Sequence, residues 1–129
     1  MDCKISVLAS GSSGNSIYVS DGKMNILVDV GLSGKEMEKR LNEIDVSPDE
    51  IDAIIITHEH RDHVSGAGIF SRRYNIPIYA NDPTWNNSYK CIGKINKKNC
   101  EIIKNDFMLG DIAVHPFSIS HDAASPFAY

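Results

Sequence analysis

The sequence has few cysteines and no long apolar run. Its three cysteines, Cys3, Cys91 and Cys100, include no Cys-x-x-Cys pair, which predicts reduced thiols of a cytosolic protein rather than a disulfide framework. No stretch approaches the roughly 18 consecutive apolar residues of a membrane span, and residues 1–4 lack the apolar core of a secretory signal. These absences predict a cytoplasmic protein with no membrane partner.

Basic residues are not in excess either. The net charge is −4, from 13 Lys and Arg and 17 Asp and Glu, whereas a nucleic-acid-binding domain usually carries a basic footprint. A nuclease stays open as a function, because bound divalent cations can supply positive charge locally. The 129 residues, of which 42% are apolar, predict one domain over residues 1–129 that is large enough to bury a core.

The most informative stretch is Thr57–His63, which holds three of the five histidines. The apolar, β-branched run 51–56 just before it predicts a buried strand of a mixed or parallel sheet. Alternate residues at a strand end share a face, so His58 and His60 can point the same way. The last two residues of the stretch can converge on them after a turn.

This stretch has the composition of a metal site. Imidazole and carboxylate groups are ligands of zinc, manganese and iron, and the spacing can supply two metal ions from one loop. A helical His-Glu-x-x-His zinc site is excluded, because the position four residues after His58 is Asp62. Glu59 and Arg61 are expected to point away from the metals. The alternative is a polar, solvated loop that is rich in histidine.

Periodicity and turn signals predict the order of the elements. A β-meander opens the chain, with a Gly/Ser loop over residues 10–15 and a second turn at Asp21-Gly22. A capping box at Ser33 starts the first helix. Near the end, strands 100–104 and 112–119 are expected to pair with each other. The expected strands are 4–8, 16–20, 24–28, 51–56, 78–80, 100–104 and 112–119. One helix is expected after Ser33, a second over Gly66–Tyr74, and a third that starts at Asp82-Pro83.

The run His58-x-His60-x-Asp62-His63 after an apolar strand resembles the signature of the metallo-β-lactamase superfamily. Four further segments are similar to its YycJ/WalJ branch, which lies on the ribonuclease Z and ribonuclease J side of the superfamily. They are Ser10-Gly11-Ser12-Ser13-Gly14-Asn15-Ser16, Asp29-x-Gly31-Leu32-Ser33, Ser71-Arg72-Arg73-Tyr74 with Pro77-Ile78-Tyr79-Ala80, and Ser120-His121-Asp122-Ala123. The resemblance implies an α/β (α+β) fold, namely the N-terminal half of an αββα sandwich: a β-meander followed by a mixed sheet with flanking helices.

The resemblance also implies a set of metal ligands. His58, His60 and His121 would hold one ion, and Asp62 and His63 belong to a second metal position, with Asp62 as the candidate catalytic carboxylate. The implied cofactor is Zn²⁺, with Mn²⁺ or Fe as alternatives, and the complete fold would hold two ions.

Other residues carry two interpretations each. The resemblance implies that the Asp29 carboxylate helps to orient the metal-binding histidine loop without binding the metal itself. The alternative is an aspartate that only forms a turn at the end of its strand. The Gly/Ser loop, with candidate substrate-binding residues Ser12, Ser13, Gly14 and Asn15, is either a nest of backbone N–H groups facing a phosphate or a flexible turn. Arg72 and Arg73 either stabilise the end of their helix or contact a phosphate. His115 is expected to be structural or exposed.

The resemblance implies a metal-dependent hydrolase, and its branch favours a phosphodiesterase or nuclease that uses metal-bound hydroxide on DNA or RNA. The absence of a secretory signal weighs against an antibiotic-degrading enzyme. The alternatives are a glyoxalase II-like thioester hydrolase and a non-catalytic fragment that binds a metal or a partner chain.

Two further ligand motifs of the superfamily, a bridging Asp and a last His, would fall beyond residue 129. We therefore expect a chain that stops before the C-terminal half of the family fold and binds one metal ion or none. An apolar sheet face should then be uncovered, on the strands that contain Ile26, Val28, Ile54 and Ile56. The chain would self-associate, or pair with the missing half, through this face or an open strand edge.

Overall fold

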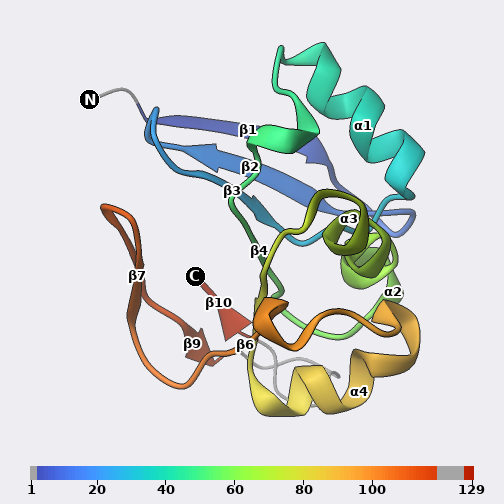
Figure 1. The fold of residues 1–129 in the computed structure, drawn as a ribbon, viewed down its shortest axis with the longest axis vertical. Coiled ribbons are helices and arrows are strands. Elements are labelled where there is room, and N and C mark those ends of the chain that lie inside the picture. Colours follow the sequence, from blue (N-terminus) through green and yellow to red (C-terminus); the bar gives the residue numbers. More distant parts are fainter. Residues whose placement is uncertain (1–2, 119–126) are drawn as a thin grey trace.

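The centre of the molecule is a mixed six-stranded sheet (Figure 1). The computed structural model describes residues 3–118 and 127–129. Strands β1, β2 and β3 are antiparallel neighbours, whereas β3, β4, β5 and β6 run parallel to one another. The strand order follows the chain, and the bounds are β1 (Lys4–Ala9), β2 (Ser16–Ser20), β3 (Asn25–Val28), β4 (Ala53–Ile55), β5 (Ile78–Ala80) and β6 (Cys100–Ile102).

Helices connect the parallel strands, as expected for crossover connections. Their bounds are α1 (Gly34–Glu43), η1 (Pro48–Glu50), α2 (Arg61–Val64), α3 (Ala67–Tyr74), α4 (Asp82–Ile92) and η2 (Lys97–Asn99). The Ser33 hydroxyl accepts the backbone N–H of Glu36 at 3.2 Å, so the predicted cap of α1 is confirmed. Of the helices described, none combines the length and the apolar character needed to cross a lipid bilayer.

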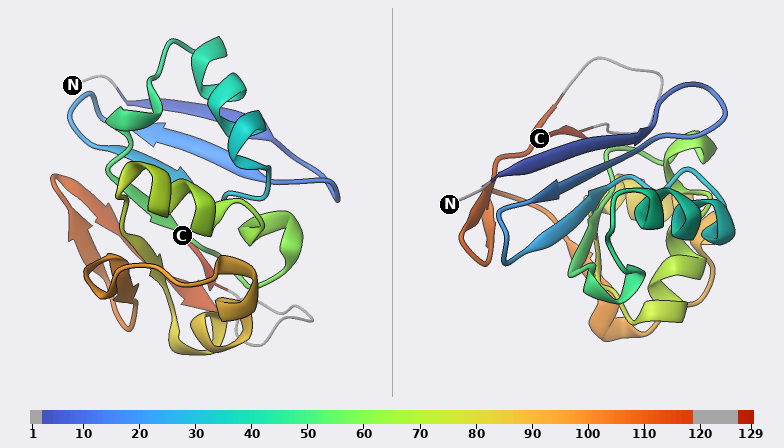
Figure 2. Two further views of the ribbon diagram at one scale, coloured as in Figure 1. Left: turned by 45° about the vertical axis from the view of Figure 1, so that its right-hand side comes forward. Right: turned by 90° about the horizontal axis from the view of Figure 1, so that it is seen from above.

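One face of the sheet is covered by the helices (Figure 2). Met37 and Leu41 of α1 and Phe70 of α3 are fully buried, and they belong to one apolar cluster with Leu27 of β3 and Ile54 of β4. Burying each such side chain contributes roughly 1.5–3 kcal/mol. This core fixes α1 and α3 against the parallel strands, whose ends carry the candidate metal loop.

The opposite face is covered in its parallel half by a hairpin of β7 (Phe107–Leu109) and β8 (Ile112–Val114). Ile26 and Ile55 point to this side and pack in a second cluster with Leu109 and Val114. Two short strands, β9 (Phe117–Ser118) and β10 (Phe127–Ala128), pair nearby, and the Tyr129 hydroxyl donates to the carbonyl of Ile56 at 2.8 Å.

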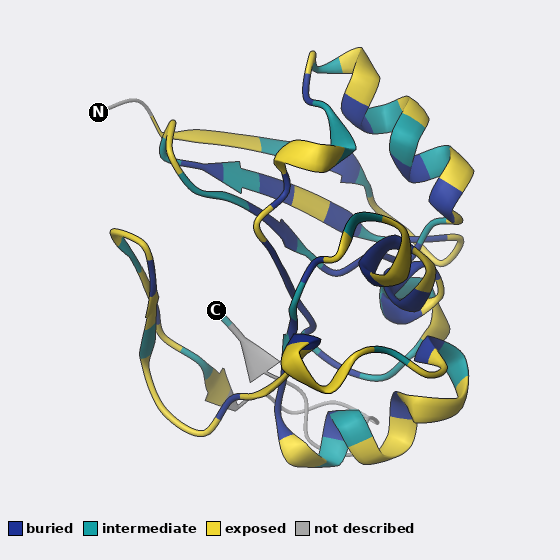
Figure 3. Ribbon diagram, viewed as in Figure 1, coloured by how far each residue is buried: buried dark blue, intermediate teal, exposed yellow. Residues whose placement is uncertain are grey.

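The expectation of a bare face at Ile26, Ile54 and Ile56 is therefore wrong. These side chains are 2%, 0% and 1% exposed, because the helices cover one face and the β7–β8 hairpin covers the other. The expected fourth residue, Val28, is half-buried. Exposed apolar side chains lie instead on the antiparallel edge of the sheet, where β1 is largely exposed along its length (Figure 3).

Two other expectations also change. Residues 100–104 do not pair with 112–119, because β6 extends the parallel edge at β5, while β7 and β8 form their own hairpin around Gly110. The expected strand 112–119 is interrupted after Val114 within the described residues. The turn after His60 is a helix, α2, so the residues that follow it are positioned by helical rather than loop geometry.

Candidate metal centre

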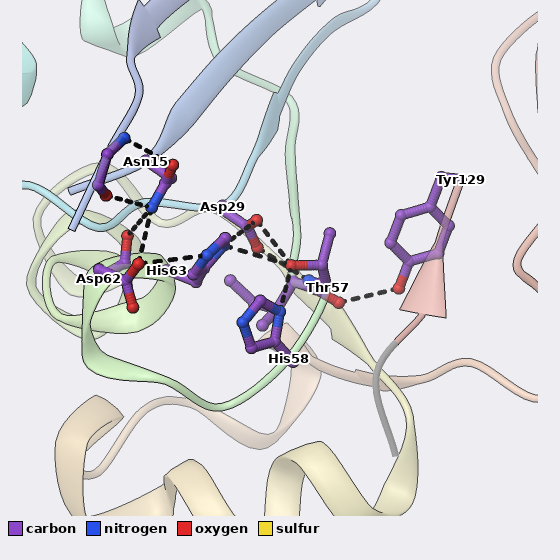
Figure 4. Close-up of polar contacts among 9 residues, drawn as sticks. Asn15, Asp29, Thr57, His58, Asp62, His63 and Tyr129 are labelled. Carbon is purple, nitrogen blue, oxygen red and sulfur yellow. Dashed lines mark hydrogen bonds and ion pairs between the residues drawn. The ribbon is translucent and has the colours of Figure 1, made fainter. Parts of the chain in front are cut away.

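Two parallel strands bring the candidate site together. Asp29 directly follows β3, and Thr57 and His58 follow β4, its parallel neighbour, so both segments leave the sheet at the same edge. The Asp29 N–H donates to the carbonyl of Ile55 at 2.7 Å, which ties the two strand ends together. Figure 4 shows the side chains of Asp29, Thr57, His58 and His63 gathered at this edge.

The Asp29 carboxylate is the centre of the polar network. The side chain is 4% exposed, and it accepts the Thr57 N–H at 2.8 Å, the Thr57 hydroxyl at 2.7 Å and His63 Nδ1–H at 2.6 Å. Its backbone is left-handed, with φ 64°, a conformation that Asp tolerates better than most residues. Asp29 therefore joins the end of β3 to the histidine loop.

The network fixes which imidazole nitrogens carry protons. The single Thr57 hydroxyl proton goes to Asp29, since a carboxylate only accepts, so the Thr57 oxygen must accept from His58 Nδ1–H at 2.9 Å. His63 donates its own Nδ1–H to Asp29. Both rings thus keep Nε2 without a proton in their neutral form, which is the nitrogen state that metal binding requires.

Helix α2 and the Gly/Ser loop hold Asp62. The Asn15 amide donates to the Asp62 carboxylate oxygen Oδ2 at 2.9 Å and to the Asp62 carbonyl at 3.1 Å, and the Asn15 N–H donates to that carbonyl at 2.7 Å. Gly31 passes so close that an added Cβ would collide with the Asp62 carbonyl. Asp62 Oδ2 lies 3.4 Å from His63 Nε2, so its carboxylate faces the same space as that nitrogen.

The histidine rings are gathered but do not by themselves complete a site. The ring centroid of His58 lies 4.8 Å from that of His60 and 3.9 Å from that of His63. Within residues 3–118 and 127–129, no three His, Cys, Asp or Glu side chains are placed to hold one ion. The fifth candidate ligand, His121, lies outside the described residues. The donor chemistry fits a divalent cation, and the described part supplies a partial ligand set.

The carboxylates around His63 change its pKa, and a cation that binds this ring must displace a proton from it. Burial disfavours the charged imidazole, but the hydrogen bond and negative charge of Asp29, with a smaller contribution from Asp62, outweigh it and raise the pKa of His63 above its usual value. Cation binding at Nε2 therefore requires the loss of a proton that the carboxylates favour.

The predicted residues divide into three groups. The structure brings Asp29, His58, His60, Asp62 and His63 together. The predicted Gly/Ser nest is partly used internally, because the N–H groups of Gly14 and Asn15 donate to the carbonyls of Gly11 and Asp62, while Ser12 and Ser13 are exposed. His115 directly follows β8, pairs with Asp106 at 2.8 Å and is exposed, which agrees with the expectation for this histidine.

Sequence reasoning missed Thr57 and the true contacts of Asn15. Thr57 links three members of the network, yet a β-branched residue at a strand end carries no signal beyond strand propensity. Asn15 lies 47 positions from Asp62, so their contact depends on the path of the whole sheet. The only sequence signal at Asn15 was its position directly after the Gly/Ser turn, which indicates an irregular backbone.

We expect Asn15→Ala to weaken metal binding about tenfold, because loss of an outer hydrogen-bond partner typically costs on the order of 10–100-fold. Asn15→Asp should be at least as damaging, since it sets a second carboxylate against Asp62. Calorimetric titration with Zn²⁺ or Mn²⁺ measures both. Ser13→Ala, in the exposed part of the same loop, is the control, and equal affinities in all three variants would remove Asn15 from the site.

The sequence matches the family model described as the metallo-beta-lactamase superfamily over residues 9–122. The chain is 45% identical over 130 residues to "Exodeoxyribonuclease WalJ" of Streptococcus pneumoniae serotype 2, covering 98% of this chain and 48% of that protein. It is 42% identical over 131 residues to "Exodeoxyribonuclease YycJ" of Bacillus anthracis, covering 100% and 50%. The chain thus spans about half the length of these relatives.

Solved structures share the fold at low sequence identity. Rm3 metallo-beta-lactamase superposes with a TM-score of 0.73 at 18% identity, over 91% of this chain and 50% of that one. BJP-1, a subclass B3 metallo-beta-lactamase of Bradyrhizobium japonicum, gives 0.72 at 14% identity, over 88% and 48%. The family match over residues 9–122, together with the similarity to WalJ and YycJ, shows that the chain belongs to the metallo-beta-lactamase superfamily, in its WalJ/YycJ-like branch.

Proposed function

We propose that the chain functions in metal-dependent hydrolysis of phosphodiester bonds in nucleic acid, as a nuclease or a major part of one. The observation that carries this proposal is the network in which Asp29 and Thr57 orient the rings of His58 and His63 through Nδ1, with Nε2 of His63 3.4 Å from the Asp62 carboxylate. The similarity to proteins named exodeoxyribonucleases favours DNA as the substrate.

The residues of the chain divide the work of such a site. His58, His60, Asp62 and His63 would hold divalent ions, with His121 as a further ligand, and Asp29 and Asn15 would keep the ligands oriented. We propose Zn²⁺ as the metal, with Mn²⁺ or Fe as alternatives. When bound, the ions supply a water of lowered pKa and positive charge for the phosphate oxygens. Asp62 would accept a proton or bind a metal ion at the same edge of the sheet.

The test offers three substrates to one preparation of the chain loaded with Zn²⁺ or Mn²⁺: a chromogenic phosphodiester, a labelled DNA strand and a thioester. Metal content is measured by elemental analysis on the same sample. We expect phosphodiester turnover that a chelator abolishes. Turnover of the thioester alone would replace the proposal with a glyoxalase II-like activity, and bound metal with no turnover would indicate a non-catalytic module.

We also propose that the exposed edge of the sheet pairs with a second apolar surface. Ile5 and Val7 on β1 are 68% and 65% exposed, and they share a face with Ile17 of β2, which is 36% exposed. Strand β1 is also a sheet edge, with backbone groups open to pairing. Exposed apolar clusters of this kind mark interaction surfaces or aggregation sites.

We expect the chain to self-associate through this edge in a concentration-dependent manner, as measured by sedimentation velocity. The double change Ile5→Ser and Val7→Ser should weaken association on the order of tenfold or more, because each removes buried apolar area from the contact. Met108→Ser is the control, since Met108 is 59% exposed on the separate β7–β8 hairpin. A chain that stays monomeric at every concentration contradicts the proposal.

A further inference from the structure

The charge of the chain is unevenly distributed. Although the net charge is −4, the stretch between His63 and Cys100 contains six lysines and arginines and a single acidic residue, Asp82. From Pro83 to Cys100 there are four lysines and no acidic residue at all. A local basic segment in an acidic chain is the pattern that favours binding of a polyanion.

Four of these charges lie within one continuous segment of nine residues, called here the lysine surface (Lys90, Lys94, Lys97 and Lys98). Lys90 lies in the last turn of α4, Lys94 in the connection that follows it, and Lys97 and Lys98 in η2. All four side chains are exposed. In residues 3–118 and 127–129 none of them forms an ion pair, in contrast to Arg40 with Glu36 and Arg73 with Glu38.

A hollow of about 350 Å³ lies against the lysine surface, between the end of α3 and the turn before η2. Arg72 is anchored there, because its Nη1 donates to the carbonyls of Ile92 at 2.7 Å and Lys94 at 3.3 Å. That anchoring uses backbone carbonyls rather than a carboxylate, so the positive charge of Arg72 is not neutralised by an ion pair in the described part of the chain. Lys94 and Asn96 complete a lining rich in hydrogen-bond donors.

Only the Lys90 end of the lysine surface is linked to the candidate metal centre, through α4, whereas the hollow and η2 lie at the opposite edge of the sheet, where β5 and β6 begin. Helix α4 contacts α2, the helix that begins directly after His60 and carries Asp62 and His63. On α4 the side chain of Tyr89 is 61% exposed, one position before Lys90 in the sequence. An exposed aromatic ring on the helix that also carries a lysine suits a single strand, whose bases stack while its phosphates pair with cations.

We propose that the lysine surface binds the phosphate backbone of a nucleic-acid strand, independently of its sequence. Lysine ammonium groups act as mobile point charges that suit such non-specific phosphate contacts. The inference deepens the proposed function by giving the substrate a binding surface separate from the metal ligands. An acidic protein is the competing occupant, but the exposed ring of Tyr89 on the same helix as Lys90 and the amide-lined hollow favour a strand with both bases and phosphates.

Binding of a fluorescently labelled single-stranded oligonucleotide, followed by anisotropy in the presence of chelator, tests this without any role for metal. The variant Lys94→Gln/Lys97→Gln/Lys98→Gln removes three charges from the lysine surface. We expect its affinity to fall on the order of tenfold, and the slope of log affinity against log salt to decrease in magnitude by about 2, since each single-strand phosphate contact contributes about 0.7.

The matched control removes the same number of charges elsewhere, as Lys23→Gln/Lys35→Gln/Lys39→Gln, all three exposed and away from α4. Its salt slope should stay like that of the unmodified chain. Equal losses in both triple variants would overturn the inference, because only total charge would matter. Competition by polyglutamate as strong as by the oligonucleotide would assign the surface to an acidic protein instead.

Failure of the proposed hydrolysis is distinguishable from failure of this inference. If the chain turns over no phosphodiester and yet its strand binding depends on the lysine surface, the inference stands and the catalytic proposal fails. If the lysine-surface variant hydrolyses a small chromogenic phosphodiester as fast as the unmodified chain, and also binds DNA as tightly, the catalytic proposal stands and this inference fails.

Discussion

His58→Ala should lower metal affinity by more than the roughly 10–100-fold that loss of an outer hydrogen-bond partner costs. His58 is 6% exposed, its Nδ1 proton is committed to Thr57, and its ring lies 3.9 Å from that of His63. Alanine removes the Nε2 donor of this ring. We expect His60→Ala to cause a similar loss, because its ring lies beside that of His58.

The measurement is metal content after dialysis against a limiting Zn²⁺ or Mn²⁺ concentration, with affinity from competition against a chelating dye. His115→Ala is the matched control: the same substitution, in an exposed histidine that follows β8 and is paired with Asp106. Its metal content should be unchanged. An equal loss of bound metal in His58→Ala, His60→Ala and His115→Ala would show that the metal binds to histidines non-specifically rather than at this loop.

Much of this site follows from local sequence signals. An apolar strand followed by alternating histidines places His58 and His60 at a strand end, and the Ser33 cap defines the start of α1, because these features depend on neighbours in the chain. The bend after His60 does not follow so directly. His60 is extended, with ψ 144°, and the four-residue helix α2 begins at the next position. The histidine-rich sequence does not show whether a helix or a simple turn follows His60.

What the sequence did not predict depends on contacts between distant segments. Strand β6 pairs with β5, but the local sequence pattern does not indicate which strand it should pair with. The burial of Ile26 required knowing that the β7–β8 hairpin folds back over the sheet. To predict the role of Thr57, one must know that Asp29, 28 positions earlier, lies beside it. The Thr57 hydroxyl matters only because it donates to that carboxylate at 2.7 Å.

Asp29→Ala should reduce metal affinity about 10–100-fold, as changes behind metal ligands do, and should also destabilise the fold. It removes the acceptor of three hydrogen bonds, which leaves the Thr57 N–H and His63 Nδ1–H without their partner. Orphaned donors at partly buried positions cost about 1–3 kcal/mol each. Loss of this carboxylate also frees the ring of His63 to rotate, so Nε2 is no longer held toward Asp62.

Two companion variants separate the causes. Asp29 has a left-handed backbone, so Asp29→Gly should be more stable than Asp29→Ala by about 1 kcal/mol, because glycine adopts this conformation without a Cβ penalty. Both should lose metal affinity equally, since neither retains the carboxylate. Asp29→Asn keeps one acceptor oxygen and tolerates the backbone, so its stability should lie nearest the unmodified chain.

The decisive comparison is the affinity of Asp29→Asn, measured by metal titration alongside chemical unfolding of all three variants. An amide can accept the Thr57 N–H but cannot also accept both the Thr57 hydroxyl and His63 Nδ1–H on its second atom, which becomes a donor. Its metal affinity should therefore fall nearly as far as that of Asp29→Gly while its fold is retained. Native affinity in Asp29→Asn would show that the carboxylate does not orient His63, and unfolding of Asp29→Gly would make Asp29 a structural residue of the β3–β4 edge.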